Sequence, residues 1–418
     1  MVDMKKTDFD ITNPAFLYNM DEHAKFLFEN EPRGFYWHPI YKHWIIFSMD
    51  RLKEASKMNE DFSLATTSPA PFDPTPLGGI WRAGYALTLR EGTHHHLAKK
   101  HSLDWLKRKA SFFTKVFTDN LHKDLDSITP GTSFKAYDVI GKTVTHTQIQ
   151  TIEFPWNELD VTEEFVKEAY FEWMKPGGIF SNFNPDFDYD KPVAETTEFY
   201  KMFSRIVDQA IDYYHNDAQD QDTMINMTRN LNDKQEEYND NPKQMAYMFI
   251  QSLWTVVIPT FSLSMYQNIA MNFCKYPDIV NQLKKDRSLV PAFARESLRL
   301  APLKGGIRDI TRQLDYHGYK FHQHGRILLY TYGANRDPKY YKDPYEFKLT
   351  RDDEPLPVTL AYGPHHCTGD FLVKHFLEII TNALLDRFDT FEITKEAELL
   401  PAMFGSTTVY KDLEFKFS

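Results

Sequence analysis

Cysteine is scarce in this chain. Only two of its 418 residues, Cys274 and Cys367, are cysteine, and this excludes a framework of disulfide bonds. Sparing use of cysteine fits a reducing compartment. The sequence also has no apolar run of membrane-spanning length and no apolar stretch of the kind found in signal peptides. From these absences we expect a cytoplasmic protein that does not enter the membrane.

Positive charge and flexible sequence are scarce as well. The formal net charge of −11 at pH 7 argues against general nucleic-acid binding. No Gly/Ser-rich linker, low-complexity segment or internal repeat divides the chain. The length alone would allow about two or three domains. Because no linker is present, we expect residues 1–418 to form a single domain.

The periodicity of apolar residues predicts a mainly α protein with a smaller β portion, an α+β class. A strand is expected at His43–Ser48, followed by a helix from Asp50 to Met58 that Asp50 would cap. Short strands are expected over 303–332, and β hairpins over 391–417. Helices are expected at Arg90–Asp126, over most of 136–275, at Pro291–Leu300 and at Phe371–Phe388.

Cys367 lies in the most informative segment of the chain. Gly363 and Gly369 flank it, and the helix expected at Phe371–Phe388 follows directly. Glycines allow a tight turn that passes close to a flat group, while the helix N-terminus and nearby amide N–H groups favour a thiolate over a thiol. A thiolate presented in this way is a metal ligand or a nucleophile. The alternative is a buried, inert cysteine after a turn.

Three further motifs accompany this segment. Glu296 and Arg299 are spaced so that a helix would bring the carboxylate and the guanidinium to one face, although an ordinary surface ion pair has the same spacing. An Asn-Arg-Asp-Pro segment begins at Asn335, and Arg351 follows it. Upstream, consecutive histidines at 94–96 suggest a metal site, but neighbouring side chains on a helix point in different directions.

In order and spacing over roughly residues 290–390, these motifs resemble the cytochrome P450 family. The resemblance implies a mostly helical single domain that holds haem b, iron protoporphyrin IX, between a long central helix and the helix after the cysteine. Cys367 would supply the axial thiolate, whose electron donation to iron favours cleavage of the O–O bond. Gly363 and Gly369 would let the loop pass close under the porphyrin.

The resemblance also implies how the haem is held. Its two propionates require cationic or hydrogen-bonding partners. The residues that match the family's propionate partners are His95, Lys99, Arg308 and His365. Lys99 stands where the family usually has Arg, and an ammonium group lacks the bidentate fork of a guanidinium. Glu296, Arg299 and Arg351 would form a buried charge network with a structural role.

The central helix departs from the family pattern. Members usually carry an acid followed by Thr, and this pair relays protons to dioxygen. Here Thr260 occupies the acid position and Phe261 the alcohol position, and no carboxylate occurs between Gln251 and Lys275. Pro259 removes a backbone N–H and should kink the helix. If the register differs by one residue, Thr260 takes the alcohol position, and the acid is still missing.

A missing relay changes the expected chemistry. Protons would come from the substrate or from a water that it holds, unless peroxide replaces dioxygen or the enzyme rearranges a substrate that is already oxidised. Peroxide-using members carry an Arg at this site and rearranging members a longer cysteine loop, and this chain has neither. Members that couple aromatic rings frequently lack the relay, because a phenol or a pyrrole supplies a proton itself.

We therefore expect an oxidoreductase of secondary metabolism that couples a small aromatic substrate, a phenol or pyrrole with or without halogen, through a radical C–C or C–O bond. The alternative is a monooxygenase that hydroxylates a small hydrophobic substrate with protons from the substrate or from water. The 33 Phe, 23 Tyr and 7 Trp residues suit a pocket for flat rings. Candidate catalytic residues are Cys367, Thr260 and Phe261, and candidate pocket residues are Trp81, Tyr85, Trp254, Ile258, Gly305, Ile307 and Phe404.

The family's use of dioxygen implies electron donors, here a ferredoxin and a ferredoxin reductase. Basic residues cluster between Lys99 and Lys115, and Lys374 and His375 follow the cysteine. Because both segments should lie on the face nearest the thiolate, an acidic ferredoxin would dock there by charge complementarity. The alternatives are a merely solvated helix face and, for the whole chain, a non-catalytic scaffold, but such scaffolds commonly lose the axial cysteine.

Overall fold

The computed structural model describes residues 14–39, 42–63, 92–151, 153–159, 162, 205–227, 264–351, 353–402 and 407–418. The α-helices are α1 (Pro14–Tyr18), α2 (Met20–Asn30), α3 (Met49–Ala55), α6 (Gly92–Asp126), α7 (Lys142–Thr151), α12 (Gln267–Lys275), α13 (Pro277–Lys285), α14 (Val290–Leu300), α15 (Thr331–Ala334) and α16 (Asp370–Arg387). Residues 205–216 are helical as well. Shorter helices of other kinds are η1 (Tyr137–Gly141), η2 (Trp156–Glu158), η5 (Arg287–Leu289) and η6 (Gly363–His365).

The strands form one larger sheet and three smaller ones. The larger sheet has the order β1-β2-β8-β5-β3, and the smaller ones are β4-β12-β9, β6-β7 and β10-β11. The strand bounds are β1 (Phe35–His38), β2 (His43–Ile46), β3 (Phe62–Ser63), β4 (Ser133–Lys135), β5 (Gly305–Ile310), β6 (Leu314–Tyr316), β7 (Tyr319–Phe321), β8 (Arg326–Tyr330), β9 (Phe391–Lys395), β10 (Glu398–Ala402), β11 (Thr407–Lys411) and β12 (Glu414–Phe417).

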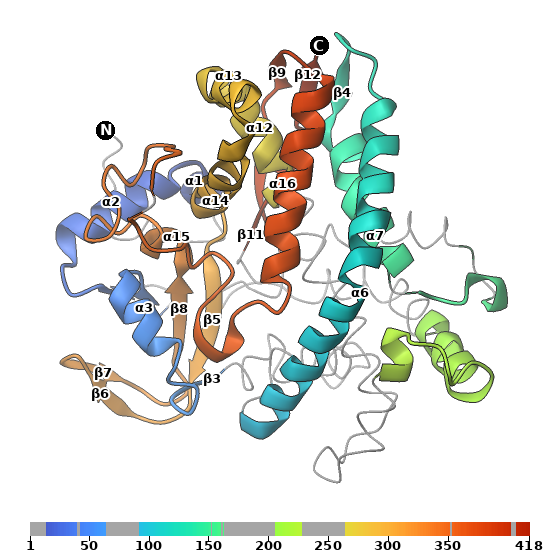
Figure 1. Ribbon diagram of the computed structural model, residues 1–418. Coiled ribbons are helices and arrows are strands. Elements are labelled where there is room, and N and C mark those ends of the chain that lie inside the picture. The colour runs from blue at the N-terminus through green and yellow to red at the C-terminus, as the bar shows by residue number, and fades with distance from the viewer. Residues whose placement is uncertain are drawn as a thin grey trace.

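The larger sheet joins strands from distant parts of the chain. β2 and β8 run parallel, and the other neighbours are antiparallel. Phe35 and Trp44 enter an apolar cluster with α3, whereas Tyr36 and Ile45 enter another with α1 and α2. This alternation follows from the two-residue period of a strand. Helices α2 and α3 lie beside the sheet (Figure 1), which is therefore covered on both faces.

An extensive apolar cluster draws on α6, α12, α14 and α16. α16 runs beside α6 (Figure 1), and the rings of Phe117 and Phe376 stack between them with centroids 4.2 Å apart. Phe273 of α12 meets Phe293 of α14 edge to face, with centroids 5.4 Å apart. Fully burying a side chain of this size contributes about 1.5–3 kcal/mol. These rings therefore fix the four helices against one another, and with them the start of α16, which directly follows the Cys367 loop.

The predicted fold class is confirmed, since the protein is mainly α with a smaller β portion. The strand expected at His43–Ser48 is β2, and the helices expected at Pro291–Leu300 and Phe371–Phe388 are α14 and α16. The strands expected over 303–332 are present as β5–β8. Over 391–417, β10 and β11 pair as expected for a hairpin, whereas β12 pairs with both β9 and β4, so the hairpin prediction holds only in part. No helix among the described residues combines the length and the apolarity needed to cross a membrane.

The prediction that Asp50 caps a helix is wrong. The helix is α3, but its N-cap residue is Ser48, and Asp50 lies in the first turn. The Asp50 carboxylate instead accepts hydrogen bonds from Lys339, at 2.5 Å, and from the Tyr340 hydroxyl. A contact with a distant segment has therefore replaced the local cap that the sequence indicated.

Gly305, one of the expected pocket residues, supports a first prediction. It has φ +124°, and a Cβ there would lie 1.8 Å from the carbonyl oxygen of Leu329. Gly318 also has a positive φ, +79°, but a Cβ there would approach Arg33 Nη1 only to 3.7 Å. We expect Gly305→Ala to lower the free energy of unfolding by more than about 3 kcal/mol, because the backbone must move, and Gly318→Ala by about 1 kcal/mol. Urea unfolding measures both losses, and equal values would contradict the prediction.

Candidate functional site

The main chain around Cys367 folds back on itself before α16 begins. The Cys367 N–H donates to the Leu360 carbonyl oxygen at 3.0 Å, and the His366 N–H donates to the Gly363 carbonyl oxygen at 3.0 Å. Gly363 has φ +74°, and a Cβ there would lie 2.9 Å from the carbonyl oxygen of Ser56. Glycine is therefore required at 363 by the end of α3, against which the loop packs.

The surroundings of the Cys367 sulfur work against a free thiolate. Burial raises the pKa of the Cys367 thiol, and the charge of Asp370 adds to this increase. The Gly369 N–H and the charges of Lys99 and Lys374 lower the pKa, but burial outweighs them. The Gly369 N–H lowers this pKa, in the direction that the sequence predicted for the amide groups, while burial acts against it. A cation at the sulfur reverses the balance, since a coordinating thiol loses its proton.

Helix α6 carries two residues to this loop. The ring of His95, which is buried, and the ring of His365 lie with their centroids 4.1 Å apart. One turn further along α6, the Lys99 ammonium group donates to the carbonyl oxygens of Pro364 and His366, the latter at 2.6 Å. Residues four apart share one helix face, so His95 and Lys99 reach the loop together. His95, Lys99 and His365, all expected at the propionates, are thus brought together.

Arg308, also expected at a propionate, lies on β5. It is buried, and its Nη1 donates to the Ile307 carbonyl oxygen at 2.8 Å. A Cβ on Gly306 would lie 3.1 Å from the same nitrogen, so the absence of a side chain at 306 makes room for the guanidinium. These described contacts lie within β5, and the place of Arg308 at a propionate stays a prediction.

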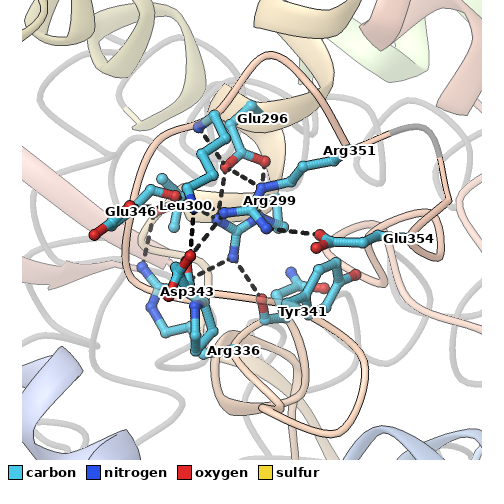
Figure 2. A network of polar contacts seen from close by, with 12 residues as sticks. Glu296, Arg299, Leu300, Arg336, Tyr341, Asp343, Glu346, Arg351 and Glu354 are labelled. Atoms are coloured by element: carbon cyan, nitrogen blue, oxygen red, sulfur yellow. Dashed lines mark hydrogen bonds and ion pairs between the residues drawn. The ribbon is translucent and has the colours of Figure 1, made fainter.

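Glu296 lies at the centre of a buried ionic network (Figure 2). Its carboxylate accepts two hydrogen bonds from Arg299, at 2.8 and 2.7 Å, and one from Arg351 Nε at 2.8 Å. The main-chain N–H of Lys348 donates to the same carboxylate at 3.1 Å. The three charged side chains are only 2–3% exposed. This burial excludes the surface ion pair that the same spacing allowed.

The two guanidinium groups also bind the chain that leads to the cysteine loop. Main-chain carbonyl oxygens accept from Arg299 at Asn335, Pro344 and Glu346, and from Arg351 at Lys342, Asp343 and Glu346. Burial by itself would lower the pKa of Arg351, but the carboxylates of Glu354 and Glu296 outweigh it and raise that pKa. Each charge of Figure 2 thus meets another charge or a main-chain oxygen.

The Asn-Arg-Asp segment connects the network to more distant parts of the fold. Asn335 Oδ1 accepts from the Val358 N–H at 2.8 Å, shortly before the cysteine loop. Arg336 donates to the Asp21 carboxylate of α2 at 2.5 Å. Burial would raise the pKa of Asp21, but Arg336 and the Tyr332 hydroxyl lower it overall. Sequence reasoning missed Asp21, because no spacing rule relates a residue of α2 to one more than three hundred positions later.

Several expected site residues lie outside the described part of the chain. These are Trp81, Tyr85, Trp254, Ile258, Thr260, Phe261 and Phe404. The described pocket candidates, Gly305 and Ile307, are on β5, where they pair with Tyr330 and Leu328 of β8. Their role in a substrate pocket stays a prediction.

A cysteine loop that precedes a long apolar helix, braced by a buried Glu-Arg-Arg network in a mainly α fold, defines a class of thiolate-ligated haem proteins. Residues 281–417 match the family model Cytochrome P450. The solved structure of CalO2 superimposes with a TM-score of 0.79 at 14% identity, and the match covers 99% of each chain. Over residues 281–417 this chain is therefore similar to the cytochrome P450 family, and its fold is that of CalO2.

Curated relatives match about a third of the chain. Vitamin D3 dihydroxylase of Streptomyces griseolus is 32% identical over 135 residues, which are 32% of this chain and 33% of that protein. The 6-deoxyerythronolide B hydroxylase of Saccharopolyspora erythraea is 31% identical over 124 residues, 29% of this chain and 30% of that protein. The match therefore spans about a third of the length of these relatives.

Haem b is the cofactor of this family, and the residues around Cys367 fit it. The thiol is accompanied by the Gly369 N–H and by cationic groups that oppose its protonation. His95, Lys99 and His365 offer hydrogen-bond donors to anionic propionates. Burial lowers the pKa of Lys99 and the charge of Cys367 opposes this, so an anionic group beside Lys99 would stabilise its charged form.

The buried network supports a second prediction. We expect Glu296→Gln to lower the free energy of unfolding by about 3–5 kcal/mol, because two buried guanidinium groups lose their shared counter-charge. Asp119→Asn is the matched acid-to-amide control. Asp119 pairs with Lys115 at 2.5 Å, but both side chains are largely exposed, so its loss should have little effect. Urea unfolding at low salt compares the two variants, and similar small losses would show that the network does not support the fold.

Proposed function

We propose that this chain is a haem-thiolate oxidoreductase that couples a small aromatic substrate, a phenol or pyrrole with or without halogen, through a radical C–C or C–O bond. The observation that carries the proposal is the convergence of His95, Lys99 and His365 at the Cys367 loop, where the cofactor would be held. When bound, haem supplies one-electron and dioxygen chemistry. The residues of this chain determine what that chemistry acts on.

The proposed roles follow the geometry of the loop. Cys367 would bind the iron through its sulfur, and Gly363 and Gly369 would keep the loop free of side chains beside the porphyrin. The propionates would be bound by His95, Lys99, Arg308 and His365. Gly305 and Ile307 of β5 would line the substrate pocket, together with Trp81, Tyr85, Trp254, Ile258 and Phe404.

Coupling is supported by the sequence that is expected to form the central helix. No carboxylate occurs between Gln251 and Lys275, and Thr260 and Phe261 stand where an acid–alcohol pair is usual in the family. A substrate with an acidic O–H or N–H would supply the missing proton and would also lose a hydrogen atom readily. This is why we favour a phenol or a pyrrole over an inert hydrocarbon.

The atoms and electrons of the coupling reaction balance as follows. Two rings each lose one hydrogen atom, and the two radicals combine in a C–C or C–O bond. Dioxygen accepts these two electrons and two protons, together with two electrons from the donor proteins and two protons from solvent, and leaves as two molecules of water. No oxygen atom from dioxygen enters the product.

Monooxygenation of a small hydrophobic substrate is the second candidate. The relatives described above are a dihydroxylase and a hydroxylase by name. In addition, Ser264 and Gln267 are fully buried, and their side-chain polar atoms have no hydrogen-bond partner among the described residues. Buried polar groups commonly bind an internal water. Such a water would supply protons to a substrate that has none to give.

We propose a ferredoxin, reduced by a ferredoxin reductase, as the electron donor. Part of the basic cluster is already paired with carboxylates, namely Arg108, Lys109, Lys115 and Lys374. Lys100, Lys107 and His375 are exposed. These exposed groups on α6 and α16 would contact an acidic partner.

We also propose that residues 1–418 form a single haem domain in the cytoplasm. The single domain is supported by the fold match to CalO2, which covers 99% of both chains. The compartment is supported by the cysteines, since Cys274 and Cys367 are both free, as is usual in a reducing environment.

Isotope labelling tests the reaction. The purified protein is incubated with ferredoxin, reductase, NADPH and a bromophenol under labelled dioxygen. We expect dimers that carry no labelled oxygen, because the substrate supplies the proton and the rings combine with each other. A labelled alcohol as the main product would contradict coupling and favour monooxygenation.

In the same experiment, Cys367→Ser tests the haem-thiolate assignment. We expect loss of the thiolate Soret band of the reduced CO complex, and a fall in turnover beyond the roughly 100-fold that losing a supporting residue of a metal site costs. Cys274→Ser is the control, because burial raises the pKa of the Cys274 thiol to about 12 and makes it unreactive. A Cys367→Ser variant with an unchanged spectrum would refute the assignment.

A further inference from the structure

The ammonium group of Lys99 lies against the main chain of the cysteine loop. It donates to the carbonyl oxygens of Pro364 and His366, the latter at 2.6 Å, across 265 and 267 positions of sequence. These carbonyls belong to residues shortly before Cys367. Lys99 therefore holds the loop at two points directly ahead of the sulfur.

The arrangement of these carbonyls explains why lysine serves here. An ammonium group has three N–H donors that point in separate directions, whereas the donors of a guanidinium lie in one plane. Two main-chain oxygens that converge from alternate residues suit the compact charge of Lys99. The third donor remains for another acceptor, such as a propionate. Lysine in place of the family's usual arginine therefore changes what this residue holds.

The charge of Lys99 also acts on the sulfur. The ammonium group contacts the carbonyl oxygen of His366, the residue directly before Cys367, and this contact brings its charge close to the sulfur. Lys374, another cation that acts on the sulfur, is paired with Asp370 at 2.7 Å, which weakens its field. The described hydrogen-bond acceptors of Lys99 are neutral carbonyls, so its positive charge is not cancelled by them.

We propose that Lys99 is a positioning residue for the axial sulfur: it fixes the loop from Pro364 to His366 and keeps a positive charge beside Cys367, which limits electron donation to the iron. The inference rests on the proposed function, since it requires Cys367 to be the haem ligand. A cation close to the sulfur favours the reduced state of the site, because reduction adds negative charge there.

The test compares Lys99→Met with Lys100→Met, an exposed neighbour on α6, in the haem-loaded protein. Two quantities are measured: the midpoint potential of the haem, and the hydrogen exchange of the His366 and Cys367 amides, which are both hydrogen-bonded within the loop. For Lys99→Met we expect the ratio of reduced to oxidised iron at a fixed potential to fall about tenfold, or about 59 mV for one electron. Exchange of the two amides should quicken at least about tenfold. Lys100→Met should change neither quantity.

Lys99→Arg separates the two effects, because it keeps the charge and loses the compact donor geometry. Its ratio of reduced to oxidised iron should stay within about twofold of the unmutated protein, while loop exchange still quickens. If Lys99→Met fails to retain haem, the exchange measured in Lys99→Arg decides, and unchanged exchange there overturns the inference.

Two results in Lys99→Met would overturn the inference directly. A lower potential with unchanged loop exchange would assign Lys99 to a propionate alone, and an unchanged potential would remove its effect on the sulfur. In both cases the unmutated protein keeps its thiolate band with CO, so the proposed function stands. A missing thiolate band in the unmutated protein would instead overturn the proposed function, and this inference with it.

Discussion

The buried carboxylate of Glu296 binds two guanidinium groups, and the cysteine loop and the chain before it depend on this interaction. Removing such ions from water costs several kcal/mol each, and their mutual attraction offsets this only when every remaining donor is satisfied. Here the remaining donors of Arg299 and Arg351 bind carbonyl oxygens within residues 335–346. The buried ions are therefore stable only when this segment adopts the conformation that brings its carbonyl oxygens to the two arginines. The network thus fixes the conformation of the segment in addition to its contribution to stability.

That segment leads to a loop that three helices fix independently. The end of α3 leaves no room for a side chain at Gly363, and α6 contributes Lys99 and His95. At the start of α16, the N–H of Gly369 interacts with the sulfur. Metal ligands need this kind of support, because the residues around a ligand orient it and tune its donor strength. The position of Cys367 thus follows from packing across the whole fold, although the motif that contains it is short.

The sequence predicted the features that depend on residues close together in the chain. Apolar periodicity located α14 and α16, and the i, i+3 spacing of Glu296 and Arg299 indicated one helix face, as the structure confirms. The sequence did not predict contacts in which a side chain binds a partner that is distant in the chain. Asp50 was assigned to a helix cap but binds Lys339, and the partner of Arg336 on α2 had no signal at all. The sequence indicated amide groups that favour a Cys367 thiolate but not the burial that raises the pKa of the thiol, because burial is a property of the packed fold and no local motif encodes it.

This chain departs from the family pattern at Lys99 and in residues 251–275, and both differences concern cleavage of the O–O bond. Cleavage of the O–O bond is favoured by electron donation from the thiolate and by protons at the distal side. The lysine charge that we propose beside Cys367 would reduce the first contribution, and residues 251–275 contain no carboxylate, the family's usual source of the second. A substrate with its own acidic proton would supply the second contribution, and a ring that is easily oxidised would need less of the first, whereas an inert hydrocarbon meets neither need. Both the cysteine loop and the sequence expected to form the central helix therefore favour a phenol or a pyrrole as the substrate.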